Sequence, residues 1–167
     1  PPRNTTYSIM AQLDLGEDGT LTGKLRERAE GYKALDYRTQ LYRESPEEFM
    51  NSYQLKKLPE GEITDYEIKN LDSIDAPLMV SMNISTKDFC QSAGDFLYLS
   101  PLLMMKWEEN PFSEPTRIYP IDFPYPLLEA GSILIQVPQG YKIESLPKSS
   151  KMTLPGRDMS FAYSVQP

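Results

Sequence analysis

The feature that most constrains the fold is a strict alternation of side chains near the start of the chain. Apolar residues occupy every second position from Tyr7 to Leu15, with mostly polar residues between them. This period of two is typical of a strand with one buried face. Asp18-Gly19, which follows, supplies the positive φ angles of a tight hairpin turn, and the alternation resumes at Leu21. We therefore predict a β-hairpin over residues 6–28.

A helical stretch then interrupts the strand pattern. Apolar residues recur at helical spacing over residues 32–43, and Ser45-Pro46-Glu47-Glu48 has the serine cap, early proline and following glutamate of a helix start. We predict helices over residues 32–43 and 46–57. Their apolar stripes are interpreted as core packing rather than as a groove for a partner.

The remaining predicted strands are short and separated by turns. They fall near residues 62–70, 77–84, 96–99, 133–137, 141–145, 151–153 and 159–165. The predicted fold class is mainly β: an antiparallel β-sandwich of eight or nine short strands, with a one- or two-helix insertion near residues 32–58. We expect a single β-rich domain over residues 1–167, with a candidate sub-boundary near residues 108–116.

Two residue counts exclude much of the catalytic repertoire. The sequence has no histidine, which removes serine–histidine and cysteine–histidine catalysis, histidine-ligated zinc and imidazole proton shuttles from this chain. Cys90 is the only cysteine, so the chain forms no intrachain disulfide and no multi-cysteine metal site. Without a histidine base we expect Cys90 to be an inert, partly buried thiol. We expect no metal and no cofactor.

Charge and hydropathy restrict the partners. The chain has 17 Lys and Arg against 24 Asp and Glu, a net charge of −7, which argues against nucleic-acid binding. The apolar runs are far shorter than the roughly 20 residues of a membrane-spanning helix. No signal-peptide pattern is visible after Pro1, and both ends resemble cuts from a longer chain, so we expect a fragment of a larger protein.

Paired carboxylates are the acid–base chemistry that remains. The candidates by residue type are Asp72, Asp75, Glu108, Glu109, Asp122 and Glu129. No spacing singles out a pair, and a solvated surface role is favoured for each of them.

A segment of interleaved aromatic residues and prolines spans residues 117–126. Tyr119, Phe123 and Tyr125 form a candidate ligand platform for a sugar or a peptide. The alternative, which we favour, is a stiff edge segment whose aromatic side chains cap the core.

Several stretches resemble one known family. The two longest are Arg117-Ile118-Tyr119-Pro120-Ile121-Asp122-Phe123 and Val137-Pro138-Gln139-Gly140-Tyr141-Lys142-Ile143-Glu144-Ser145-Leu146-Pro147. They resemble the C-terminal region of large exported transglutaminase-like proteins, which occur mainly in the Bacteroidetes. The hairpin around Asp18-Gly19-Thr20-Leu21, the stretch Gly31-Tyr32-Lys33-Ala34, and Arg38 also resemble the segment that follows the core of that family.

The resemblance implies a context more than an activity. In that family a β domain precedes a papain-like core of the cysteine-peptidase type, and a β-rich domain of unknown function follows it. The catalytic cysteine, histidine and aspartate lie in the core, so no catalytic residue is carried over to this chain. The residues that match the family are structural: Arg117, Pro120, Pro138, Gly140, Tyr141 and Pro147. Pro138 would end a strand, Gly140 would adopt a turn conformation, and Arg117 would bond a nearby carboxylate or carbonyl.

Two functional hypotheses follow. The first is a non-catalytic accessory module of an exported protein, in the periplasm or at the cell surface. Its partner would be an upstream transglutaminase-like core on the same polypeptide, and it would pack against that core or position substrate for it. The alternative is an independent glycan- or peptide-binding module that uses the aromatic–proline segment.

Overall fold

The computed structural model describes residues 5–58, 60–87, 89–106, 116, 118, 123–156 and 159–167. The chain divides into two compact units, the first ending at Gln136 and the second beginning at Val137. Each unit is described by itself below.

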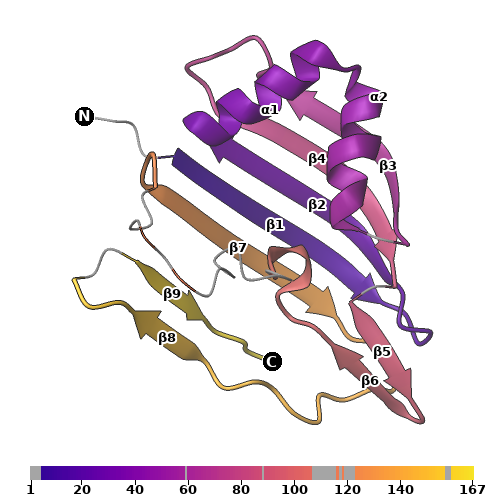
Figure 1. Ribbon diagram of the computed structural model, residues 1–167. Coiled ribbons are helices and arrows are strands. Elements are labelled where there is room, and N and C mark those ends of the chain that lie inside the picture. Colours follow the sequence, from indigo (N-terminus) through magenta and orange to yellow (C-terminus); the bar gives the residue numbers. More distant parts are fainter. Residues whose placement is uncertain are drawn as a thin grey trace. The chain divides into compact units, whose positions relative to one another are not determined.

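A five-stranded sheet forms the frame of the first unit. Its strands are β1 (Thr5–Leu15), β2 (Leu21–Glu30), β3 (Glu62–Lys69), β4 (Leu78–Thr86) and β7 (Leu127–Gln136). They lie in the order β3-β4-β2-β1-β7 (Figure 1). The pairs within β3-β4-β2-β1 are antiparallel, whereas β1 and β7 are parallel and place Thr5 opposite Leu127.

The helical insertion lies on one face of this sheet (Figure 1). Helix α1 spans Tyr32–Arg43, and α2 spans Pro46–Phe49. The Ser45 side chain accepts from the Glu48 amide while the Glu48 carboxylate accepts from the Ser45 amide, a complete capping box. The chain then continues as a π-helical turn, Met50–Gln54, and a 3₁₀ turn, Leu55–Lys57, so residues 46–57 are helical throughout, with changes of winding.

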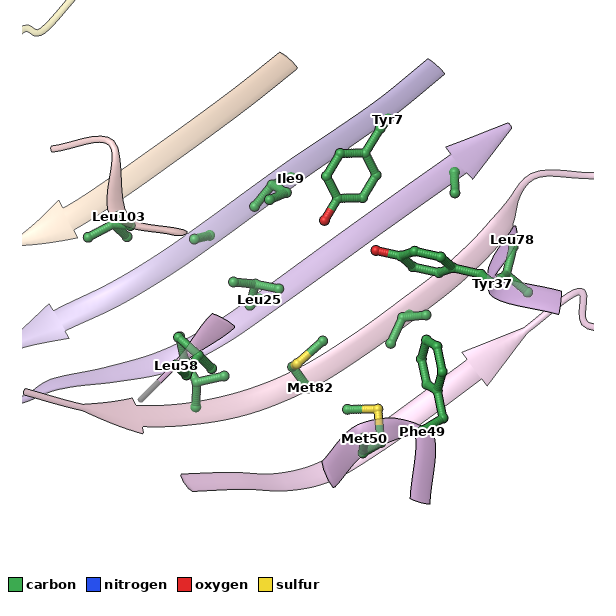
Figure 2. Packing of buried hydrophobic residues seen from close by; sticks show 14 of the residues in the cluster. Tyr7, Ile9, Leu25, Tyr37, Phe49, Met50, Leu58, Leu78, Met82 and Leu103 are labelled. Atoms are coloured by element: carbon green, nitrogen blue, oxygen red, sulfur yellow. The ribbon is translucent and has the colours of Figure 1, made fainter. Parts of the chain in front are cut away.

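The core lies between the helices and the sheet. Alternate residues of β1, β2 and β4 are buried on the helix-covered face, as the period of two predicts. Leu25 and Met82 of the sheet lie on the same side as Phe49 and Met50 of the helical segment (Figure 2). The apolar stripes of the insertion therefore serve core packing.

Two small hairpins complete the described strands. β5 (Cys90–Ala93) pairs with β6 (Phe96–Leu99) in the first unit, and a short 3₁₀ turn follows at Leu103–Met105. In the second unit, β8 (Ser150–Thr153) pairs with β9 (Ser160–Tyr163).

The mainly β class and the helical insertion are confirmed, and nine strands occur among the described residues. The arrangement is compatible with a β-sandwich in which the insertion covers one face of the large sheet. The expectation of purely antiparallel pairing is wrong for β1 and β7. A parallel pair needs a long crossover, and more than half of the unit lies between these strands.

Two strand assignments also change. The strand predicted over residues 141–145 is absent, since residues 137–149 form no ladder and the Tyr141 amide bonds to the Pro138 carbonyl in a turn. Strand β5 was not predicted, because Cys90-Gln91-Ser92-Ala93 has no apolar alternation. The sub-boundary expected near residues 108–116 lies outside the described residues, apart from residue 116.

Candidate functional site

A carboxylate lies in the core of the first unit. Glu27 of β2 points toward the helix-covered face and is 1% exposed. Four groups donate hydrogen bonds to it: the hydroxyls of Tyr7 (2.7 Å) and Tyr37 (2.8 Å), the amide of Gln54 (2.8 Å) and the ammonium of Lys57 (2.9 Å). We call these five residues the Glu27 network. Because a buried charge is tolerated only when it is paired and hydrogen-bonded, this set of donors explains why a glutamate is found there.

The network joins the insertion to the sheet. Tyr7 and Glu27 come from the sheet, Tyr37 from α1, and Gln54 and Lys57 from the turns that follow α2. Lys57 donates further bonds to the hydroxyl of Tyr37 (3.0 Å) and the amide oxygen of Gln54 (2.9 Å). The hydroxyls of Tyr7 and Tyr37 are directed toward the same space (Figure 2).

A second cation lies beside the network. The Lys33 ammonium donates to the Tyr53 hydroxyl at 3.0 Å and lies 5.0 Å from the ring centre of Tyr37. Lys57 lies 4.9 Å from the ring centre of Tyr53. Both ammonium groups also lie within 6 Å of the Tyr7 ring centre, so three tyrosine rings separate two cations. Each cation–π contact contributes about 0.5–2 kcal/mol, more where water is excluded.

These surroundings fix the protonation states. Burial alone would raise the pKa of Glu27, but Lys57 and the hydrogen-bond donors outweigh it and lower the pKa below its ordinary value of 4.5. Burial, reinforced by the Glu27 charge, raises the pKa of the Tyr7 and Tyr37 hydroxyls far above the usual range. Burial lowers the pKa of Lys57, against the opposing attraction of Glu27. At neutral pH the network is an ionised carboxylate surrounded by neutral phenols.

This arrangement favours a structural role over acid–base chemistry. Among the described residues, no buried side-chain nitrogen or oxygen lacks a hydrogen-bond partner. The carboxylate is occupied by four donors, and the phenols are held protonated, so neither offers a free base. The network therefore resembles a polar joint between helix and sheet.

A cleft opens next to the network, between α1 and the start of β7. It has a volume of about 430 Å³. Its lining residues are Tyr32, Lys33, Leu35, Asp36 and Thr39 from α1 with Tyr125, Leu127 and Glu129 from the β7 side. The rings of Tyr32 and Tyr125 stack at 4.5 Å with an angle of 17° and form an aromatic wall.

The 3₁₀ turn at Leu103–Met105 covers the next part of β7. The Met105 side chain lies where a Cβ of Gly131 would be, so a larger residue at position 131 would displace it. Ile133 and Ile135 beyond it are partly buried against the core. Leu127 and Glu129 lie before this cover, at the cleft, and both are exposed.

The structure brings one residue of the predicted ligand platform into the cleft. Tyr125 stacks on Tyr32 there. Phe123 is described and 51% exposed, but it is not among the lining residues. Tyr119 lies outside the described residues.

The family-like structural residues fall in two groups. Arg117 and Pro120 lie outside the described residues. In the second unit, the Tyr141 amide donates to the Pro138 carbonyl and closes a turn in which Gly140 has a φ of 88°. Pro138 lies two residues after the end of β7. This pattern is typical of a type II turn, whose third position favours glycine. Pro147 is exposed in the irregular segment that follows.

Cys90 begins β5 and is partly buried. Burial, together with the Asp18 carboxylate, raises the pKa of its thiol. A nucleophilic cysteine needs the opposite shift, so this environment favours an unreactive thiol.

Of the candidate carboxylates, the structure describes Asp72, Asp75 and Glu129. Asp72 accepts a hydrogen bond from the Tyr42 hydroxyl, and Glu129 lines the cleft. Glu108, Glu109 and Asp122 lie outside the described residues. Within the ranges that the structure describes, no three acidic or cysteine side chains come together as a metal site.

Sequence reasoning missed the Glu27 network. One signal was available: Glu27 stands between Leu25 and Ala29, at a core position of an alternating strand. A charge at such a position indicates either a partner or a functional role. The partners Gln54 and Lys57 could not be identified, because they come from turns of unusual helical winding.

Comparison with protein families finds a match in the C-terminal part of the chain. The model of a family described as a domain of unknown function with a solved structure (DUF3858) matches residues 95–167. No curated protein matches the chain, and no solved structure does. Within the described residues, no helix combines the length and the apolar character that a bilayer crossing requires.

Proposed function

We propose that this chain is a non-catalytic accessory module of an exported transglutaminase-like protein. It packs against the catalytic core of that protein or positions substrate for it, and it works outside the cytoplasm. The observation that carries the proposal is the Glu27 network: the one deeply buried cluster of ionisable groups among the described residues is fully occupied in joining helices to sheet.

Two further observations support the proposal. The chain has no histidine, and the pKa of its only thiol is raised by burial and by Asp18. The link to a transglutaminase-like core comes from the resemblance of residues 117–123 and 137–147.

The test compares the complete polypeptide with a version that lacks this segment. Incorporation of a fluorescent primary amine into a glutamine-bearing protein and hydrolysis of peptides are both measured. We expect activity to require the core, to fall when the segment is deleted, and to be absent from the segment alone. Turnover by the segment alone would refute the proposal.

An independent binding module is the second candidate. The cleft lined by Tyr32 and Tyr125 favours it, since ligand clefts are commonly lined by aromatic side chains. Glycan and peptide arrays probed with the wild-type chain and with Tyr125→Ala distinguish the two. A flat response on both arrays would count against this second candidate.

A further inference from the structure

The two edges of the five-stranded sheet differ in how well they are protected against pairing with another chain. On the β3 edge, the pairing register shifts between Thr64 and Glu67, and Asp65 between them has a φ of 47°. The strand also carries Glu62, Glu67 and Lys69. A bulge and charged side chains are the usual devices that prevent another chain from pairing with an edge.

Among the described residues, the β7 edge has no bulge and far fewer charged side chains. Strand β7 has ten residues, Leu127–Gln136, no proline and one ionisable side chain, Glu129. Among the described strands it pairs with β1 alone. Leu128 and Leu134 are 62% and 66% exposed. A long, unbroken edge of this kind is suited to strand addition by an extended polypeptide.

The cleft at the start of β7 selects the charge of an added strand. Lys33 is the cation that lines it, but the Lys33 ammonium bonds to the Tyr53 hydroxyl and lies over the tyrosine rings. Asp36 and Glu129 are exposed carboxylates of the same cleft. Asp36 also attracts Lys33, but two carboxylates against one ammonium leave the lining of the cleft with a net negative charge.

The shape of the cleft suits a long basic side chain. Tyr125 and Leu127 provide apolar surface for a methylene stem, and the carboxylates of Asp36 and Glu129 provide partners for its charged end. Leu127 and Glu129 are paired with Thr5 and Tyr7, which point to the helix-covered face. A strand added beside β7 would place alternate side chains on that same face, next to the cleft.

We propose that the free edge of β7 binds an extended polypeptide segment by strand addition, with a lysine or arginine side chain of that segment in the cleft beside Asp36 and Glu129. This inference rests on the proposed role in substrate positioning and gives it a site and a ligand class. Backbone hydrogen bonds along β7 supply affinity, and the cleft supplies the preference for a basic residue.

Fluorescence anisotropy with short labelled peptides tests the proposal. The first peptide alternates valine and threonine around a central lysine, and a twin has glutamate in place of the lysine. A third peptide keeps the lysine but carries N-methyl groups on consecutive residues, which removes the backbone donors of both its edges. Each is titrated with the wild-type chain and with Asp36→Asn/Glu129→Gln. The control variant, Glu62→Gln/Glu67→Gln, removes two exposed carboxylates from the β3 edge.

We expect the lysine peptide to bind best and the N-methylated peptide not to bind. The Asp36→Asn/Glu129→Gln variant should bind the lysine peptide more weakly, by up to about fivefold for each carboxylate removed, which is the range of a partly exposed ion pair. The control variant should bind this peptide as well as the wild type does. Equal binding of the lysine and glutamate peptides, or binding that survives N-methylation, would overturn the proposal. Failure of the chain to bind any of the peptides would also overturn it. Self-association of the chain through β7, detected by sedimentation, would overturn it as well. A negative result here leaves the amine-incorporation assay of the whole polypeptide to decide the proposed function separately.

Discussion

Glu27 is the residue whose environment says most about this molecule. It is an ionised carboxylate in the core, with two phenols, one amide and one ammonium donating to it. Replacing a buried ion pair by apolar residues is often harmless, whereas removing one partner leaves the other charge uncompensated.

Glu27→Gln should therefore destabilise the chain strongly. The substitution keeps the size of the side chain but leaves the Lys57 ammonium without its counter-charge. We expect the free energy of unfolding to fall by about 3–5 kcal/mol, measured by urea denaturation. Glu17→Gln, in the exposed β1–β2 turn, is the control and should change it by less than about 0.5 kcal/mol.

The stability that Glu27 provides should also depend on pH in a defined direction. The pKa of Glu27 is lower in the folded chain than its ordinary value of 4.5, so its contribution is complete above about pH 4.5 and is lost as the pH falls through the folded pKa. The stability difference between the wild type and Glu27→Gln should narrow in acid. A difference that stays constant from pH 7 to about pH 3 would contradict the assignment of an ionised Glu27.

At the scale of elements, Arg38 holds a loop to a helix. Its guanidinium, on α1, donates to the backbone carbonyls of Asn70, Leu71, Ser73 and Ala76, in the connection between β3 and β4. Arginine is suited to this position because its planar group directs several donors at once, which the point charge of a lysine cannot do. The loop thereby obtains partners for carbonyls that no ladder satisfies.

Arg38→Lys should release this loop. We expect a loss of about 2 kcal/mol in the free energy of unfolding, since hydrogen bonds to charged groups contribute more than neutral ones. Hydrogen exchange should rise across residues 70–77. Arg43→Lys, exposed in the last turn of the same helix, serves as the control; equal effects of the two substitutions would show that the loop does not depend on the guanidinium.

Gly23 in β2 is constrained by the neighbouring strand. Its φ is 150°, and a Cβ there would lie 2.2 Å from the carbonyl oxygen of Gln12. Gly23→Ala should destabilise the chain by at least about 2 kcal/mol, because the obstacle is backbone and cannot turn away. Gly94→Ala in the β5–β6 turn meets no neighbouring atom and should cost only the strain of a positive φ, about 1 kcal/mol. Thermal denaturation compares the two, and an equal loss would contradict the packing argument.

The sequence predicts individual helices and strands better than it predicts which of them lie against one another. The hairpin, the capping box at Ser45 and the helical insertion follow from local spacing and local chemistry. The parallel pairing of β7 with β1 depends on contacts across most of the first unit, which no local pattern encodes. In the same way, Tyr125 could be named as part of a ligand platform, but its partner Tyr32 belongs to a different element.

At the scale of the whole molecule, the family match and the folded units have different boundaries. The match begins at residue 95, within the β5–β6 hairpin, whereas β7 is held in the sheet by β1. All residues of the described core cluster lie in the first unit. The matched region thus takes its main strand partner from the part of the chain before it.

Two truncations should behave differently for this reason. Residues 1–136 keep the sheet and its core, and we expect one cooperative thermal transition. Residues 95–167 contain β7 without β1, and we expect them to show no cooperative transition. Cooperative unfolding of the shorter family-matched piece would contradict the view that β1 and β7 belong to one folded body.

The central claim is that this chain assists a reaction carried out by another domain. The most direct measurement is the rate of amine incorporation by the complete polypeptide, by the polypeptide without this segment, and by the segment alone. We expect a full rate for the first, a reduced rate for the second and none for the third. Product formed by the isolated segment, or an unchanged rate after its removal, would contradict the account.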